Sequence, residues 1–259
     1  MKKKVLAIAA HPDDIEFGMS GTLILLAKAG CEIHYMNVAD GSCGTAEYDA
    51  ETIAAIRLQE AKNAARRIGA KFYPPIASDL GIFYNENLLS KLGSVIREAA
   101  PDILLIPSPK DYMEDHTNTC RLAVSAAFTR GMPNCNVDPP REIINNDISV
   151  YHAQPHGNRD GMNKLIIPDI FINISEVMEE KRKLLAMHKS QKEWLDRSQG
   201  FDAYLDIMME HGREVGKMSK QWKYAEGWRP HNPLGLCAAG YDPLADLLPK
   251  NLYFSRNKH

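Results

Sequence analysis

The sequence predicts an α/β fold, built on an open and mostly parallel sheet with helices on both faces. Short runs of consecutive apolar residues recur along the first half of the chain, as expected for parallel strands that are buried on both faces. Segments with apolar residues at helical spacing separate these runs. This alternation of strand and helix implies right-handed crossovers into one parallel sheet.

The elements of the first half follow from this pattern in order. VLAIAA and DILLIP are continuous apolar runs, and the helix predicted after the second strand carries Ile and Ala at helical spacing until Gly69 stops it. The predicted strands span residues 5–10, 32–39, 71–76 and 102–107. The predicted helices span residues 17–29, 49–68, 86–99 and 117–129.

The second half of the chain is less regular. Residues 143–153 and 165–174 look like strands, and residues 175–190 and 200–217 look like helices. No linker, low-complexity tract or internal repeat separates the two halves. We therefore predict a single domain over residues 1–259, with a C-terminal α+β extension packed on the sheet.

The amino-acid composition narrows the range of partners and cellular compartments to be expected. Of the 259 residues, 25% are charged and 44% hydrophobic, and the formal net charge is −2, so neither nucleic acid nor an anionic membrane is an expected partner. No apolar run reaches the ~18 residues of a transmembrane helix. The five cysteines are odd in number and form no CxxC pair, which indicates reduced thiols and a cytoplasmic protein.

The stretch AHPDDIEFG places ionisable residues directly after the first buried strand. Ligands of open α/β sheets bind beyond the carboxyl ends of the strands. Pro12 stiffens the turn, so that His11 and Asp14 can converge on one point with Asp13 beside them. The alternative is that an aspartate caps the following helix, which is worth about 1 kcal/mol. This stretch alone leaves both interpretations open.

A second cluster, DYMEDH, also follows a buried strand and precedes a helix. Asp115 and His116 should therefore reach the same edge of the sheet as His11 and Asp14. Asp115 or Thr117 could instead cap the next helix, but two His/Asp clusters at equivalent strand ends are hard to explain as two caps. The two glycines of DGSCGT, after the second strand, either permit close backbone approach to such a site or make an ordinary turn.

His11, Asp14 and His116 offer two nitrogens and one carboxylate oxygen. Three protein ligands with one open position are typical of a catalytic zinc site, although nitrogen and oxygen ligands also accept iron and other divalent metals. Such a metal lowers the pKa of water toward about 7. Asp13 is then the spare carboxylate that can accept the proton of the water, which fits the hydrolysis of an amide or ester.

These motifs resemble the zinc-dependent N-deacetylase family that includes the LmbE-like and PIG-L-like proteins. AHPDDIEFGMSGT matches the first motif of the family, and DYMEDH matches a looser HPDH-type motif. Further matches extend over most of the chain, in DGSCGT, IRLQEA, LLAMHKSQ and YAEGW. The resemblance implies a Rossmann-like fold, zinc on His11, Asp14 and His116, and Asp13 as general base. It also implies an N-acetylglucosaminyl substrate and a homo-oligomer, either a trimer or a hexamer.

The resemblance also implies substrate contacts. Arg57 matches an arginine that contacts substrate in the family, whereas the sequence by itself favours a solvated arginine paired with Glu60 on the same helix face. Asp79, in the SDLG loop, either matches a substrate-contacting acid or caps its loop.

The chain departs from the family at Met113. The family often has a histidine there, thought to stabilise the oxyanion or protonate the leaving amine. Besides zinc itself, the candidates to replace this histidine are His188, in the matching AMHKSQ stretch, and Tyr112, which could donate a hydrogen bond. The alternative for His188, on an apolar helix, is a core histidine, and His152 or His156 could also line the site.

We therefore predict a zinc-dependent hydrolase that removes an N-acetyl or other N-acyl group from a small amino-sugar substrate. One alternative is an amidase of a glycosylated thiol conjugate, with the same machinery. Another is a non-catalytic metal- or sugar-binding relative, which Met113 favours and Asp13 opposes. A dinucleotide-binding protein would need GxGxxG after the first strand, where this chain has HPDDIEFGMSG.

Overall fold

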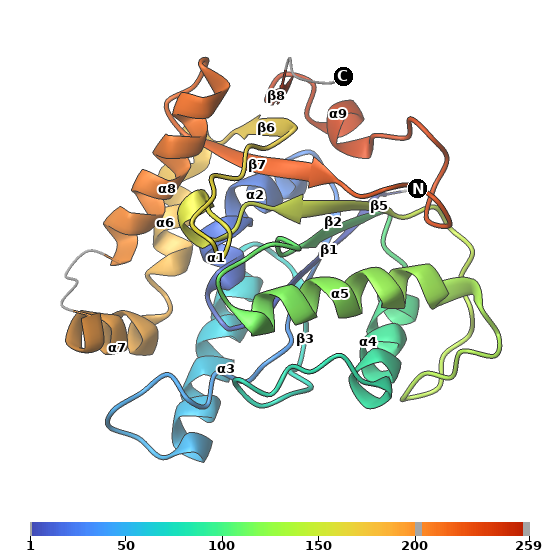
Figure 1. Cartoon of the computed structure of the whole chain (residues 1–259), viewed down its shortest axis with the longest axis horizontal. Helices are drawn as coiled ribbons and strands as arrows, with labels where there is room; N and C mark the ends of the chain where they lie inside the picture. The colour runs from blue at the N-terminus through green and yellow to red at the C-terminus, as the bar shows by residue number, and fades with distance from the viewer. Residues whose placement is uncertain (1, 200–203, 256–259) are drawn as a thin grey trace.

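One twisted sheet runs through both halves of the chain. The computed structural model describes residues 2–199 and 204–255 (Figure 1). The sheet order is β3-β2-β1-β4-β5-β7-β6-β8. The parallel strands are β1 (Lys4–Ala9), β2 (Glu32–Asn37), β3 (Lys71–Tyr73), β4 (Ile103–Ile106) and β5 (Ser149–Ala153). Antiparallel pairing adds β6 (Ile170–Asn173), β7 (Ala225–Pro230) and β8 (Leu252–Phe254).

Helices cover both faces of this sheet, which confirms the predicted fold class. They are α1 (Asp14–Gly18), α2 (Ser20–Lys28), α3 (Ala50–Arg67), α4 (Glu86–Ala99), α5 (Glu114–Phe128), α6 (Met178–Leu185), α7 (Lys189–Gln199), α8 (Tyr204–Ser219) and α9 (Pro243–Leu247). Short 3₁₀ turns occur at η1 (Thr129–Gly131), η2 (His156–Asn158) and η3 (Ser175–Val177). None of the helices in the described ranges combines the length and hydrophobicity needed to cross a bilayer.

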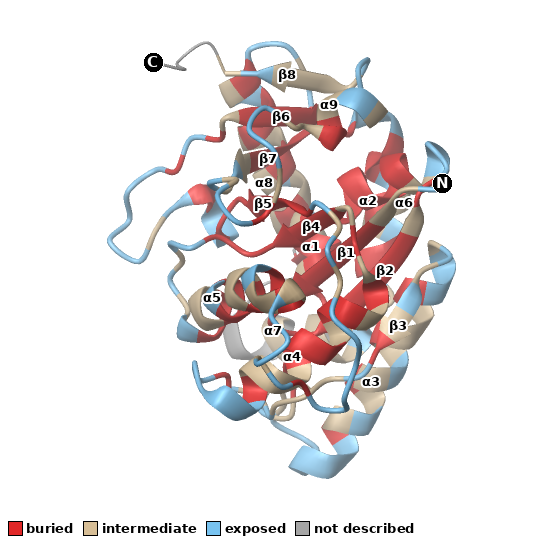
Figure 2. Cartoon of the chain, turned by 90° about the vertical axis from the view of Figure 1, so that its right-hand side faces the viewer, coloured by how far each residue is buried: buried red, intermediate tan, exposed pale blue. Residues whose placement is uncertain are grey.

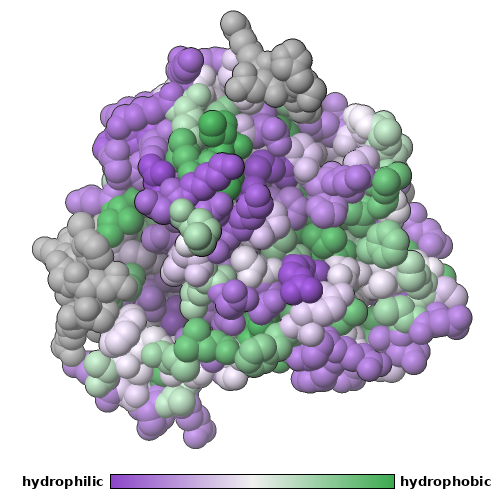
Figure 3. Space-filling model, viewed as in Figure 1, coloured by the Kyte–Doolittle hydropathy of each residue, from purple (hydrophilic) through white to green (hydrophobic). Residues whose placement is uncertain are grey.

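The alternation of side chains along β1 divides the core into two layers. Val5, Ala7 and Ala9 pack in one hydrophobic cluster with residues of α1, α2, α3, α6 and α8. Leu6 and Ile8 pack in a second cluster with residues of α4 and α5. On the surface drawn in Figure 3, hydrophobic side chains occur in separate groups among hydrophilic ones. In the interior, Figure 2 shows the buried strands between these helices. The strand ends that carry the polar motifs are thereby held between two helical layers.

The helix predicted over 17–29 starts earlier and is broken in two. It begins at Asp14, and Met19 (φ −133°) interrupts it between α1 and α2. The buried carboxylate of Glu226, on β7, accepts hydrogen bonds from the backbone N–H groups of Gly21 and Thr22. This carboxylate therefore caps the N-terminus of α2, so that a residue of the distant strand β7 stabilises the break between α1 and α2.

The other predicted helices of the first half differ little from the structure. Residues 86–99 form α4 with Asn85 as its cap, and Asp49 caps α3 at Thr52. The helix predicted over 117–129 begins three residues earlier, at Glu114, so that His116 lies in its first turn.

The second half departs further from the prediction. The predicted strands 143–153 and 165–174 shrink to β5 and β6, and the predicted helix 175–190 ends at residue 185. Of the predicted helix 200–217, residues 200–203 lie outside the described residues. The extension continues the sheet through β7 and β8, which sequence reasoning missed. Gly227 interrupts the strand pattern, and a Cβ there would lie 2.6 Å from Pro168 Cγ.

Candidate active site

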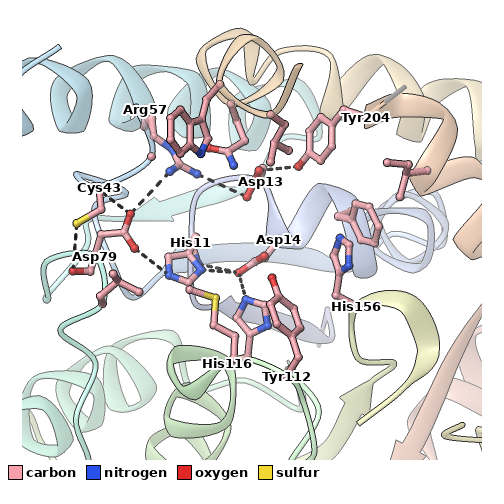
Figure 4. Close-up of a pocket in the computed structure, with 18 residues that line it drawn as sticks. His11, Asp13, Asp14, Cys43, Arg57, Asp79, Tyr112, His116, His156 and Tyr204 are labelled. Carbon is pink, nitrogen blue, oxygen red and sulfur yellow. Dashed lines mark hydrogen bonds and ion pairs between the residues drawn. The ribbon is translucent and has the colours of Figure 1, made fainter. Parts of the chain in front are cut away.

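The loops that follow β1, β2 and β4 meet at one edge of the sheet. These strands are parallel neighbours, so their carboxyl ends lie side by side. The three loops carry the HPDD, DGSCGT and DYMEDH motifs. Together with residues of α1, α7 and α8, they line a pocket of about 530 Å³ (Figure 4).

Asp14 lies between two imidazole rings in this pocket. Its Oδ2 is 3.4 Å from His11 Nδ1 and 3.4 Å from His116 Nε2. The three ligand atoms lie within 4.8 Å of one another, close enough to hold one ion. Two nitrogens and one oxygen suit a catalytic divalent metal, zinc among them.

The opposite nitrogen of each ring points to a different carboxylate. His116 Nδ1 donates to Asp111 Oδ1 at 2.9 Å, and this oxygen also accepts the backbone N–H of Met113. His11 Nε2 lies 3.1 Å from Asp115 Oδ2. Such carboxylates fix the ring orientation and the tautomer of metal-binding histidines. The cap alternative for Asp115 is wrong, because Met113 is at the cap position of α5.

The charges around the two rings suit a cation. Burial lowers the pKa of His116, but Asp14 and Asp111 outweigh it and raise this pKa to about 10. Burial likewise lowers the pKa of His11, and hydrogen bonds to Asp115 and Asp14 raise it well above its usual value. Burial would raise the pKa of Asp14, yet the two imidazoles hold it well below its ordinary range. A metal ion can take the place of these bound protons.

Asp13, next to Asp14 in the sequence, also lines the pocket. Its backbone has a φ of 110°, in the left-handed region that non-glycine residues rarely adopt. Its Oδ2 accepts a hydrogen bond of 2.6 Å from the Tyr204 hydroxyl, and its Oδ1 lies 3.7 Å from Arg57 Nη2. Burial raises the pKa of Asp13 to about 6, against the opposing effect of Arg57. A carboxylate with a pKa near neutral is suited to general base catalysis.

Arg57 is buried in the pocket wall, so the expected surface pair with Glu60 is wrong. Its Nη2 donates to Pro12 O at 2.6 Å and its Nη1 to Gly41 O at 3.2 Å, whereas Glu60 accepts from Ser190. A Cβ on Gly41 or Gly44 would lie 2.7 or 2.6 Å from the guanidinium. The glycine loop therefore makes room for Arg57.

Of the other residues predicted for the site, Asp79 and Tyr112 line the pocket and His188 does not. Asp79 lies inside the pocket, with Oδ1 3.1 Å from His11 Nε2 and Oδ2 accepting the backbone N–H of Cys43. Tyr112 is exposed at the pocket mouth, its ring edge-on to His116 at 5.7 Å. His188 is not brought to the pocket: it is fully buried, and its Nε2 lies 3.1 Å from Glu16 Oε2.

Sequence reasoning missed several pocket residues. Tyr204, at the start of α8, has no motif that distinguishes it from a core tyrosine. Phe17 and Gln191 lie within matched motifs but were not singled out. His156 does line the pocket, and its ring stacks on Phe17 with a centroid distance of 4.3 Å.

The chain is similar to known proteins in sequence and structure. A family model described as PIG-L: GlcNAc-PI de-N-acetylase matches residues 6–127. The diacetylchitobiose deacetylase of Thermococcus kodakarensis is 32% identical over 234 residues, which cover 88% of this chain and 82% of the relative. The structure of the N,N'-diacetylchitobiose deacetylase of Pyrococcus horikoshii has a TM-score of 0.75 and 25% identity, over 93% of this chain and 88% of that chain.

The fold also occurs in a different class of enzyme. The 4-carboxy-2-hydroxymuconate hydratase of Pseudomonas putida has a TM-score of 0.74 and 22% identity, over 89% of this chain and 97% of that chain. At this identity, the likeness shows the fold alone.

Proposed function

Because the chain belongs to the PIG-L (LmbE-like) family of de-N-acetylases, we propose that it hydrolyses the N-acetyl group of a small N-acetylglucosaminyl compound. One observation carries the proposal. Asp14 Oδ2 lies at 3.4 Å from an imidazole nitrogen of both His11 and His116, and the neighbouring Asp13 faces the same pocket. A ligand set and a spare base are thus side by side.

His11, Asp14 and His116 would hold the metal, for which we propose zinc. When bound, a divalent metal supplies Lewis acidity, which polarises an acyl carbonyl group and makes water a better nucleophile at neutral pH. Asp111 and Asp115 keep the two imidazoles oriented toward Asp14.

Asp13 is the proposed general base. It accepts a proton from the attacking water while the water oxygen bonds to the acyl carbon. The C–N bond then breaks, and Asp13 returns the proton to the departing amine, so one water and one amide give one carboxylic acid and one amine. Tyr204 and Arg57 hold the carboxylate in place meanwhile.

Tyr112 is the proposed donor to the developing oxyanion, since the Met113 side chain cannot donate a hydrogen bond. Although much of the Tyr112 side chain is exposed, desolvation on its pocket side and the charge of Asp14 raise the pKa of Tyr112, so its hydroxyl stays protonated and able to donate. Arg57 and Asp79 line the pocket on the side away from Tyr204 (Figure 4) and are the proposed substrate contacts.

The test is acetate release from a panel of N-acetylglucosamine derivatives, including diacetylchitobiose, by the zinc-loaded protein beside its Asp13→Asn variant. We expect acetate from the wild type, and a loss of most activity in a variant that keeps its metal. A wild type that binds zinc and frees no acetate from any sugar would contradict the proposal and favour the non-catalytic alternative. Release only from glycosylated thiol conjugates would favour the amidase alternative.

Three further expectations remain predictions. The cytoplasmic location depends on the cysteine pattern, and all five cysteines are free in the structure. The trimer or hexamer depends on the family resemblance. The single domain over residues 1–259 agrees with a sheet that takes strands from both halves of the chain.

A further inference from the structure

The pocket has two chemically different sides, which flank His11, Asp13 and Asp14. Figure 4 shows Arg57, Cys43 and Asp79 on one side of these residues, and Tyr204 and His156 on the other. We call the first group, with Gly44 and Gln191, the polar side. We call Phe17, Tyr204, His156 and Ile207 the aromatic side.

The polar side has hydrogen-bonding atoms to spare. Arg57 Nε and Gln191 Oε1 are buried atoms that find no hydrogen-bond partner among the described residues. They belong to the same part of the wall, because a Cβ on Gly44 would lie 2.6 Å from Arg57 Nη1 and 3.1 Å from Gln191 Oε1. Both atoms are covered by the pocket wall, but the guanidinium of Arg57, the amide of Gln191 and the carboxylate of Asp79 all belong to the pocket lining, and these groups suit the hydroxyl groups of a ligand.

An aromatic ring borders the polar side as well. Trp194 lines both the main pocket and a small neighbouring hollow, which it shares with Thr45 and Tyr48 of the segment that follows the glycine loop. An indole beside polar groups suits a sugar ring, which offers an apolar face and hydroxyl edges.

The aromatic side presents hydrocarbon from Phe17, Tyr204 and Ile207, together with the imidazole ring of His156 that stacks on Phe17. The Phe17 ring lies 4.3 Å from that of His156 and 6.3 Å from that of Tyr204, measured between centroids. The one hydroxyl of Tyr204 is already engaged by Asp13. Ile207 lies three residues after Tyr204 on α8, so the two side chains share a face of the helix, and Ile207 adds an aliphatic side chain to this wall. The wall therefore begins beside the catalytic carboxylate and continues away from it.

A sugar amide has two different substituents at its scissile bond: a polyhydroxylated ring on nitrogen and a hydrocarbon on the acyl carbon. We propose that the polar side binds the sugar, that the aromatic side binds the acyl chain, and that the chain turns over N-acyl groups longer than acetyl. This inference depends on the proposed hydrolase function. A single methyl group would cover only a small part of a wall built from two helices, whereas a longer chain would bury more of it.

The experiment compares N-acetyl-, N-propionyl-, N-butyryl- and N-hexanoylglucosamine as substrates of the zinc-loaded protein, with release of free amine as the readout. We expect kcat/KM to rise from acetyl to butyryl by about fourfold per methylene, the equivalent of about 0.8 kcal/mol. A kcat/KM for the butyryl compound at or above that for acetyl supports the proposal, and a lower value overturns it. Failure to release amine from every compound would instead overturn the proposed function.

A substitution on the aromatic side tests whether the acyl chain binds there. Ile207→Trp should lower the ratio of butyryl to acetyl kcat/KM at least tenfold, because the indole fills the aromatic side. Ile167→Trp is the matched control: Ile167 is 56% exposed and outside the pocket lining, so the ratio should not change. Should Ile207→Trp fail to fold, Ile207→Ala should shift the preference toward hexanoyl. An unchanged ratio in a folded Ile207 variant contradicts the assignment.

Discussion

Tyr204 donates a hydrogen bond of 2.6 Å to Asp13 Oδ2 across 191 positions of sequence. Arg57 faces the other oxygen of the same carboxylate at 3.7 Å. The proposed base is thus held between a neutral donor and a cation, supplied by α8 and α3. Asp13 needs this support because it is buried and because its own backbone has a positive φ.

Tyr204→Phe should lower kcat roughly 10- to 100-fold with little change in KM, since hydrogen bonds to charged groups are worth about 1.5–3 kcal/mol. The measurement is steady-state kinetics, with metal content determined on the same samples. Tyr253→Phe, on β8 at the far edge of the sheet, is the control and should be neutral. A Tyr204→Phe variant with wild-type kcat would show that Asp13 does not depend on this bond.

Asp111→Asn should weaken zinc binding about 10- to 100-fold, because Asp111 accepts from His116 Nδ1 and orients that ring toward Asp14. Competition with a chelating dye measures the affinity directly and without substrate. Asp246→Asn removes the same charge from an exposed position on α9 and should leave the affinity unchanged. Equal affinities for both variants and the wild type would exclude an orienting role for Asp111.

Gly44→Ala should destabilise the fold by about 1–3 kcal/mol, because the new methyl group would lie 2.6 Å from Arg57 Nη1 and this buried guanidinium is held in place by hydrogen bonds to Pro12 O and Gly41 O. It should also reduce activity, since Arg57 must move away from Asp13. Urea unfolding and kcat/KM report the two effects. At Gly18 an added Cβ meets no described atom within 4 Å, so Gly18→Ala is the matched control. Wild-type stability in Gly44→Ala would mean that the loop yields without displacing Arg57.

Stability should fall as pH falls from about 6.5 to 4, in part because of His152. Burial lowers the pKa of this imidazole to about 4, below the value of about 6.5 for an unfolded histidine. The unfolded chain therefore binds more protons in this window, and the contribution is present above pH 6.5 and lost as pH falls. His152 Nδ1 donates to Pro107 O, leaving Nε2 to accept from His231.

Urea unfolding at pH 7.5 and pH 5, for wild type and His152→Asn, measures this contribution. An asparagine can keep the donor to Pro107 O but does not titrate, so the variant should lose less stability between the two pH values. If both proteins lose the same amount, His152 is not the group responsible.

The parallel half of the fold was predictable because local signals coincide there with tertiary structure. The apolar runs of β1 and β4 are buried on both faces, and Asn85 caps a helix whose predicted bounds match α4. β7 was missed because Gly227 and Glu226 are poor strand residues by pattern. Both are explained by partners elsewhere, since Gly227 packs against Pro168 and Glu226 caps α2.

The residues of the candidate site likewise divide into those that sequence order predicts and those that depend on tertiary packing. His11, Asp14 and His116 follow neighbouring parallel strands, so their convergence could be expected from sequence order alone. Tyr204 reaches Asp13 only through the packing of α8, which no local pattern encodes. His188 was favoured by its motif, yet its imidazole bonds to Glu16 inside the core.

The cap of α2 has a consequence for how the protein is made. Glu226 is synthesised 204 residues after Thr22, whose N–H it accepts. At roughly 5–20 residues per second, the ribosome takes about 10–40 s to cover that distance. During this interval the first turn of α2 lacks its cap, and the break that ends α1 lacks its stabilising partner. The nascent chain therefore completes the surroundings of Asp13 and Asp14 only after Tyr204 of α8 and Glu226 of β7 have been synthesised as well.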